Sequence, residues 1–185
     1  MTRIIILPGI GGSGEAHWQT LWELQDPRMQ RFRPTNWDEP DLADWISALE
    51  RSVVAADEPP ILVAHSLACL LVAHWQQASA LPVAGAFLVA VPDPQAAAFP
   101  KEAKGFANPP PEPLRFPSLI VASADDPYSA LHYARLRARQ WQSRLVKIGA
   151  RGHVNGESGL SDWPEGLGLL TSFAEECAKM AARRV

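Results

Sequence analysis

The chain has 185 residues, of which 47% are hydrophobic and 20% charged, and its formal net charge is −3. This length fits one domain with a sizeable core, and the composition excludes a disordered tail, a collagen-like repeat and a small disulfide scaffold. The weakly acidic balance argues against nucleic acid as a partner, because nucleic-acid-binding domains usually carry a basic excess. We therefore expect a single globular domain over residues 1–185.

Neither a metal site nor a membrane segment is indicated. Cys69 and Cys177 lie far apart in the sequence, in no spacing typical of a disulfide framework or a metal site, so we expect buried, reduced thiols. The longest early apolar run, Ile4 to Leu7, is too short for a secretion signal or a membrane span. The expected location is cytoplasmic, with no membrane, metal or cofactor.

Strand-like and helix-like segments alternate along the chain. Short apolar runs bounded by Pro, Gly or Asp predict buried strands at 3–7, 61–65, 84–91, 118–123 and 145–148. A sixth strand is predicted at 29–34, on a sheet edge that tolerates Pro34. Longer segments with helical spacing predict helices at 16–24, 42–56, 67–80, 128–142 and 164–182.

This alternation predicts a three-layer α/β/α sandwich, doubly wound around a mostly parallel sheet of about six strands. Ligands of such sheets bind beside the carboxyl ends of the strands, so the loops that follow the strands are where chemistry is expected. The 92–117 loop is longer than most such connections. It is either a rim or lid over the site or a stiff surface excursion.

A serine stands at one of these strand ends. Ser66 follows the strand at 61–65 and precedes a helix, which is the setting of a nucleophile elbow. Ala64 and Ala68 replace the glycines of the strict G-x-S-x-G pattern, and alanine is still small enough for the tight turn. A serine that only caps a helix is the alternative.

An acid and a histidine follow in the order that α/β-hydrolases use, which is Ser, acid, His. Asp125 and Asp126 follow the strand at 118–123, and His153 follows the strand at 145–148. Spacing does not choose between the two adjacent aspartates. Asp93, which also follows a strand, ranks well below Asp126 as a candidate acid.

The glycine-rich loop after the first strand has two interpretations. It could supply an oxyanion-hole N–H from Ile10 or Gly11, opposite the N–H of Leu67, which follows the nucleophile. The loop also matches the dinucleotide pattern G-x-G-x-x-G from Gly9, but the acid that pattern needs is represented only by the more distant Asp38. The dinucleotide alternative leaves the serine, aspartate and histidine unexplained.

Two other histidines lie near the expected site. His65 precedes the nucleophile on its strand, so we expect a packed supporting role, because its side chain points away from that of Ser66. His17, beside Trp18 just past the glycine loop, is expected to border the pocket or to begin a helix.

Together these residues resemble the small, lid-poor serine hydrolases related to retinoblastoma-binding protein 9, a branch of the α/β-hydrolase superfamily. The matching segments span nearly the whole chain: 7–9, 11–14, 17–18, 64–67, 122–128, 152–155 and 163–164. The resemblance implies a compact α/β-hydrolase fold without a large cap, and a triad of Ser66, Asp126 and His153. His17, Trp18, His65 and Asn155 are our candidates for the pocket rim. Ala68 departs from the family pattern, which has glycine there.

The sequence thus predicts a serine hydrolase that acts on a small ester or related acyl substrate through an acyl-enzyme intermediate. The alternative is a catalytically weak protein-interaction module on the same fold. The pocket-protein-binding pattern L-x-C-x-E is absent around Cys69, so no protein partner is indicated.

Overall fold

The computed structural model describes residues 2–183 and contains a six-stranded sheet in the order β2-β1-β3-β4-β5-β6. Every neighbouring pair of strands is parallel. The predicted "mostly parallel" sheet is therefore parallel throughout the described residues. The strands are β1 (Ile4–Leu7), β2 (Met29–Arg31), β3 (Ile61–His65), β4 (Gly85–Val89), β5 (Ser118–Ala122) and β6 (Arg144–Lys147).

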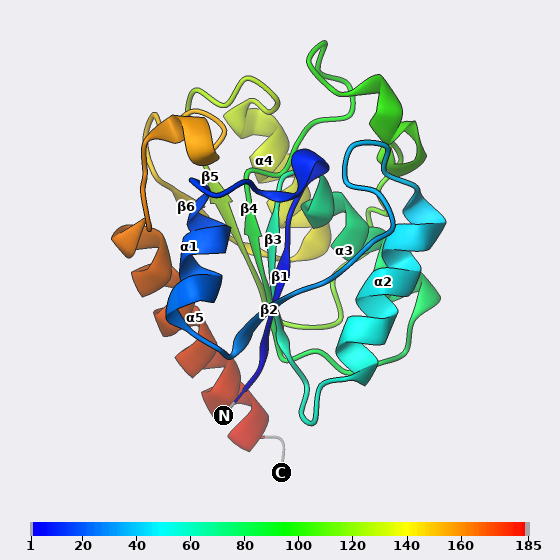
Figure 1. Ribbon diagram of the computed structural model, residues 1–185, viewed down its shortest axis with the longest axis vertical. Coiled ribbons are helices and arrows are strands. Elements are labelled where there is room, and N and C mark those ends of the chain that lie inside the picture. The colour runs from blue at the N-terminus through cyan, green and yellow to red at the C-terminus, as the bar shows by residue number, and fades with distance from the viewer. Residues whose placement is uncertain (1, 184–185) are drawn as a thin grey trace.

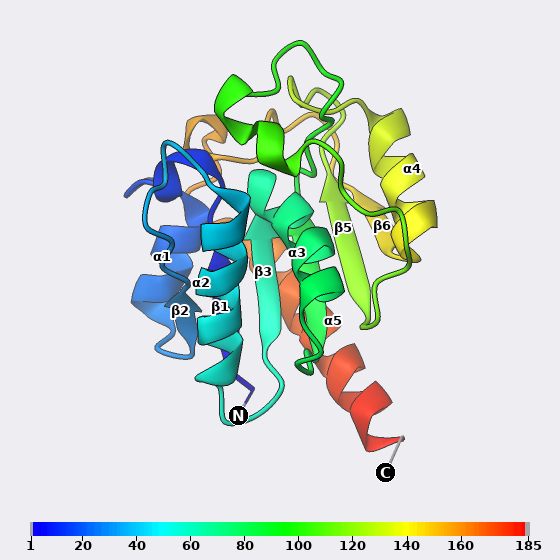
Figure 2. The same ribbon diagram turned by 90° about the vertical axis from the view of Figure 1, so that its right-hand side faces the viewer.

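Helices cover both faces of this sheet, which gives the predicted three layers. Figures 1 and 2 show α1 and α5 on one face and α2 and α3 on the other. The α-helices are α1 (Trp18–Gln25), α2 (Leu42–Val54), α3 (Leu67–Ala78), α4 (Leu131–Trp141) and α5 (Pro164–Ala182), and the short 3-10 turns are η1 (Ile10–Gly12), η2 (Lys101–Phe106) and η3 (Gly156–Ser158). The predicted helix at 128–142 begins three residues late because Asp126 Oδ1 accepts the backbone N–H of Tyr128 in a turn.

The core is divided by the sheet into two apolar layers, because successive strand residues point to opposite faces. Along β1, Ile5 and Leu7 pack with the α2, α3 and α4 side, whereas Ile4 and Ile6 pack with the α1 and α5 side. Both cysteines are buried free thiols, as predicted. None of the helices described is long and apolar enough to cross a membrane.

The long connection between β4 and β5 is anchored to the helices beneath it. Phe106 of η2 is fully buried, with its ring 5.5 Å from that of Trp45 in α2. The indole of Trp141 in α4 donates to the carbonyl oxygen of Pro110 at 2.8 Å, and the Gln76 amide of α3 donates to that of Pro113 at 3.2 Å. This segment is thus a packed part of the domain: η2 lies at the end of the sheet where the strands finish, and the chain then runs back to the opposite end, where β5 begins (Figure 2).

Two imidazoles are buried near the carboxyl ends of β1 and β3. His17, which caps α1 by accepting the Gln19 N–H, is 5% exposed, and His65 at the end of β3 is 4% exposed. Burial, with the positive charge of Arg31 as the next cause, lowers the pKa of His17 to about 3. Burial likewise holds the pKa of His65 well below its usual value. Both rings are therefore neutral in the folded protein near neutral pH.

These buried rings predict a loss of stability on acidification. The unfolded chain binds a proton at His17 near pH 6.5, whereas the folded chain does not bind one until about pH 3. The unfolded state therefore binds more protons in this window, so the free energy of unfolding falls as pH falls from 6.5 towards 3. The slope is up to roughly 1.4 kcal/mol per pH unit for each such histidine.

Urea unfolding of wild type and His17→Gln at pH 7, 6, 5 and 4 measures this effect. We expect the variant to lose less stability than wild type across the window. The exposed His132→Gln variant serves as the control for removal of an imidazole. Parallel loss of stability in wild type and His17→Gln would show that His17 does not carry the effect.

Candidate active site

Ser66 occupies a strained turn between β3 and α3. Its φ of 54° and ψ of −124° lie outside the regions that ordinary L-residues favour. The Ser66 N–H donates to the carbonyl oxygen of Val89 on β4 at 2.9 Å, which ties the turn to the neighbouring strand. Ala64 and Ala68 are fully buried on either side of the turn. The turn thus forms with alanine in place of both glycines of the strict pattern.

Gly9 lies in the loop that follows β1 (residues 8–17) and allows this loop to approach Ser66 closely. A Cβ at this position would lie 3.0 Å from Ser66 Cβ and 3.2 Å from the His65 carbonyl oxygen. Because Leu7 of β1 stands opposite Ala64 of β3 in the sheet, the two loops leave the sheet side by side. Glycine at this position therefore allows the backbone of the loop after β1 to lie against Ser66.

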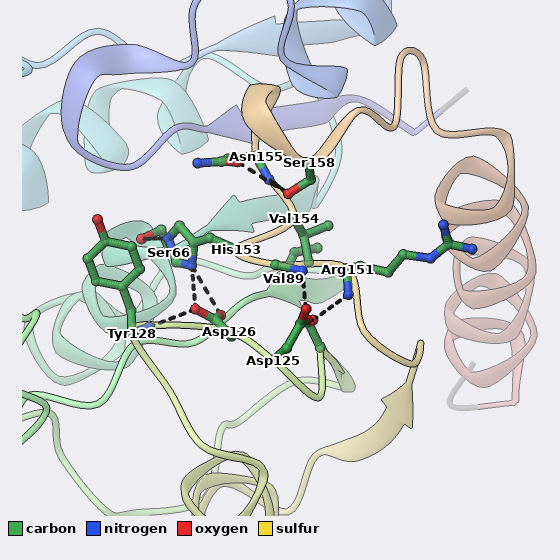
Figure 3. Close-up of polar contacts among 12 residues, drawn as sticks. Ser66, Val89, Asp125, Asp126, Tyr128, Arg151, His153, Val154, Asn155 and Ser158 are labelled. Atoms are coloured by element: carbon green, nitrogen blue, oxygen red, sulfur yellow. Dashed lines mark hydrogen bonds and ion pairs between the residues drawn. The ribbon is translucent and has the colours of Figure 1, made fainter.

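The structure brings Ser66, His153 and Asp126 into one hydrogen-bonded line (Figure 3). His153 Nε2 lies 2.8 Å from Ser66 Oγ, and its Nδ1 lies 2.9 Å and 3.1 Å from the two carboxylate oxygens of Asp126. A carboxylate only accepts hydrogen bonds, so Nδ1 carries the proton and Nε2 is the acceptor for the serine hydroxyl. The Asp126 side chain is 2% exposed and that of His153 10%, so the pair lies largely out of water.

The neighbouring Asp125 has a different role. Its Oδ1 accepts hydrogen bonds from Ser123 Oγ and from the Gly152 N–H, both at 2.8 Å, and these bonds lower the pKa of its carboxyl group. Ser123 Oγ in turn accepts the Arg151 N–H at 2.9 Å. Asp125 therefore links the β5 loop to the residue before His153 (Figure 3).

Asp93, the third candidate acid, does not touch His153. Its carboxylate accepts the Gln95 N–H at 2.8 Å within its own turn. Of the three candidate acids, only Asp126 is hydrogen-bonded to the imidazole.

The backbone hydrogen bonds of the loop after β1 distinguish between Ile10 and Gly11 as the candidate oxyanion donor. Gly11 N–H already donates to the carbonyl oxygen of Trp37 at 3.2 Å, so it is not free to bind an oxyanion. The N–H groups of Ile10 and Leu67 donate to no backbone oxygen among residues 2–183. A Cβ on Gly9 would lie 3.4 Å from the Leu67 nitrogen, which places the Ile10 segment beside the first turn of α3. The inclusion of Gly11 among the donors is thus corrected.

An open pocket of about 590 Å³ lies over Ser66 and His153. This volume falls within the range of small-molecule sites. His17, His65 and Asn155 contribute to its wall, as the sequence predicts. Trp18 does not: it is 1% exposed and packs beneath the site, so its assignment to the rim is wrong.

The sequence reasoning missed several residues of the pocket wall. Tyr128 places its ring 4.4 Å from that of His153 (Figure 3), and its position two residues after Asp126 was an available signal. Phe99 and Pro100 enter the wall from the β4–β5 connection, which identifies that segment as a rim of the pocket. Glu15 and Glu157 also line it, and only the folded chain brings these two exposed carboxylates to one pocket.

The dinucleotide alternative is not supported by this geometry. The glycines form η1 and a turn, and α1 begins only at Trp18, so the glycine pattern does not open a helix. No group of three or more potential ligands that could hold a metal occurs within residues 2–183.

Comparisons with known proteins agree on a family. The family model described as "Serine hydrolase" matches residues 4–172. A protein from Pectobacterium atrosepticum described as a YdeN-like hydrolase is 33% identical, with a TM-score of 0.85 over 96% of this chain and 92% of its own. No curated protein sequence matches the chain.

More distant solved structures share the fold. The ydeN gene product of B. subtilis is 21% identical, with a TM-score of 0.75 over 94% of this chain and 98% of its own. Mouse alpha/beta hydrolase domain-containing protein 10 is 15% identical, with a TM-score of 0.70 over 96% and 90%. The chain therefore has a compact α/β-hydrolase fold and belongs to the serine hydrolase family.

Proposed function

We propose that this serine hydrolase cleaves small esters through an acyl-enzyme intermediate on Ser66. The observation that carries the proposal is the continuous hydrogen-bonded line from Ser66 Oγ through His153 to Asp126, set at the floor of an open pocket. A serine hydroxyl is a weak nucleophile unless an adjacent base accepts its proton, and here that base lies within hydrogen-bond distance.

The acylation step follows from this geometry. Ser66 Oγ attacks the acyl carbon while its proton passes to His153 Nε2, and Asp126 stabilises the resulting imidazolium. The N–H groups of Ile10 and Leu67 receive the oxyanion of the tetrahedral intermediate, and each such donor typically lowers the barrier by about 3 kcal/mol.

The leaving group takes the proton from His153 as its bond to the acyl carbon breaks. Water then attacks the acyl-enzyme with His153 as base, which releases the acid and restores the Ser66 hydroxyl. None of these proposed reaction steps uses a metal or a cofactor.

The pocket wall suggests which esters fit. Phe99 and Pro100 give an apolar side, whereas Glu15 and Glu157 give an acidic side. The two acidic segments are in contact, since a Cβ on Gly156 would lie 3.6 Å from the His17 nitrogen. We place the leaving group on the acidic side, because Glu157 lies in η3, which continues the segment that carries His153, and His153 must protonate that group. We infer an apolar acyl group and a neutral or cationic leaving group.

The first test is labelling with a fluorophosphonate probe, which reacts with activated serines. Wild type is expected to label and Ser66→Ala is not. Ser13→Ala, which removes another pocket-lining serine that donates to Gln19 instead, is the matched control and should label. If wild type does not label, the hydrolase proposal fails and the protein-interaction module on the same fold takes its place.

The adjacent aspartates provide a second test. Asp126→Asn is expected to lower kcat by about 10³–10⁴-fold, because an amide cannot hold the imidazole in the required tautomer as a carboxylate does. Asp125→Asn keeps a carbonyl oxygen that can accept the Gly152 N–H, so we expect a loss of about tenfold or less. Steady-state hydrolysis of a p-nitrophenyl ester compares the two variants, and equal losses would contradict the assignment of Asp126.

The acidic rim predicts a charge preference. Esters with a quaternary ammonium in the alcohol portion should show kcat/KM about five- to tenfold above isosteric esters with a sulfonate at low salt, since each exposed carboxylate contributes only a modest interaction. The preference should fall in high salt and in the Glu15→Gln/Glu157→Gln variant. If the preference for the cationic ester persists both in high salt and in the Glu15→Gln/Glu157→Gln variant, these two carboxylates do not cause it.

A further inference from the structure

The loop that carries His153 has a strained backbone. Val154, the next residue, has a φ of 52°, in the left-handed region that a β-branched residue rarely adopts. Its side chain is fully buried and its N–H donates to the Arg151 carbonyl oxygen at 3.2 Å. Strained conformations of this kind persist only where surrounding contacts hold them.

Two buried ring N–H groups hold two successive carbonyl groups of the loop. His65 Nε2 lies 2.9 Å from the carbonyl oxygen of His153, and Trp18 Nε1 donates to the carbonyl oxygen of Val154 at 2.8 Å. A carbonyl oxygen only accepts, so the Nε2 of His65 carries its proton and donates. The donors come from different elements, His65 from the end of β3 and Trp18 from the start of α1.

The His65 contact ties the base directly to the nucleophile. His65 immediately precedes Ser66, so one hydrogen bond joins the strand that carries the serine to the backbone of the residue that accepts its proton. The ring of His17 packs edge-on against His65, with centroids 4.7 Å apart, and burial keeps both rings neutral. His65 therefore remains a single-proton donor to this carbonyl.

We propose that His65 and Trp18 are positioning residues, whose ring N–H groups hold the carbonyl oxygens of His153 and Val154 and so keep His153 Nε2 in line with Ser66 Oγ. This inference rests on the proposed function. Neither ring is hydrogen-bonded to a reacting atom: each N–H holds a backbone carbonyl group at or beside His153, and the His65 ring also packs against that of His153, with centroids 5.0 Å apart. Small misplacements of a reacting group are costly, since a shift of about 1 Å can reduce a rate about 10²-fold.

The chain offers a matched control for Trp18. Trp22, one turn further along α1, is equally buried, and its indole donates to the carbonyl oxygen of Asp162, which lies in the same connection as His153 but beyond η3. The two tryptophan rings are in contact, with centroids 4.5 Å apart. Trp18→Phe and Trp22→Phe thus each remove one buried indole N–H from the same aromatic cluster, but only the first frees the carbonyl group of the residue next to His153.

The experiment compares kcat and KM of the two variants for a p-nitrophenyl ester. Trp18→Phe is expected to lower kcat by about tenfold or more with KM changed less than about twofold, whereas Trp22→Phe keeps kcat within about twofold of wild type. Thermal unfolding of both variants measures their loss of stability, which we expect to be similar. Equal kcat values in the two variants would overturn the proposal for Trp18.

A second pair tests His65 should Trp18→Phe fail to fold. Gln places an amide N–H near the position of the imidazole Nε2, whereas Met fills similar space without a donor. We expect His65→Gln to retain several-fold more kcat than His65→Met, as rescue by a donor requires. Equal kcat values for His65→Gln and His65→Met would overturn the assignment of His65 as a positioning residue.

A spectroscopic readout separates this proposal from the proposed function. The proton between His153 Nδ1 and Asp126 should give a low-field proton NMR signal, assigned by its loss in His153→Gln. The signal should weaken in Trp18→Phe and persist in Trp22→Phe, whether or not the protein hydrolyses any ester. An undisturbed signal in Trp18→Phe overturns the positioning role, whereas absence of probe labelling in wild type overturns only the proposed function.

Discussion

The strained turn at Ser66 is the constraint on which the rest of the site depends. A φ of 54° at a serine is unfavourable, and it is held by the N–H bond to Val89, the buried alanines on either side and the absence of a Cβ at Gly9. The turn directs the Ser66 hydroxyl away from the line of β3, and it directs the start of α3 towards that hydroxyl. Every other group of the site is placed relative to this turn.

The other site residues come from separate loops, and cross-links between those loops fix their relative positions. A parallel sheet brings the strand ends to one edge but does not by itself align side chains on different loops. Here Asp125 joins the β5 loop to Gly152, and His65 joins β3 to the backbone of His153. The alignment of three residues far apart in sequence thus depends on hydrogen bonds made by residues beside them.

Sequence patterns predicted the elements well because each buried strand is a short apolar run that ends in a breaker. The order of serine, acid and histidine can also be predicted, since each stands just after such a strand, whereas the choice of Asp126 over Asp125 depends on the family resemblance. What the sequence could not supply was the direction of individual N–H groups. In the sequence, Ile10 and Gly11 are equivalent candidates for the oxyanion donor, but in the fold the Gly11 N–H donates to the Trp37 carbonyl oxygen. The sequence likewise predicts Trp18 at the rim, but its indole donates to the Val154 carbonyl oxygen. Both outcomes depend on tertiary contacts between distant segments.

The anchoring of the β4–β5 connection has a consequence for how substrate reaches Ser66. Phe106 is buried in the core beside Trp45, Pro110 and Pro113 are hydrogen-bonded to α4 and α3, and Phe99 of the rim is itself packed against the core, so we expect the rim to stay in place. A site with such a mouth needs no opening step before binding. Its kinetics would then lack interfacial activation, and the fixed width of the aperture, rather than the free energy of moving a flap, would set the upper limit on substrate size.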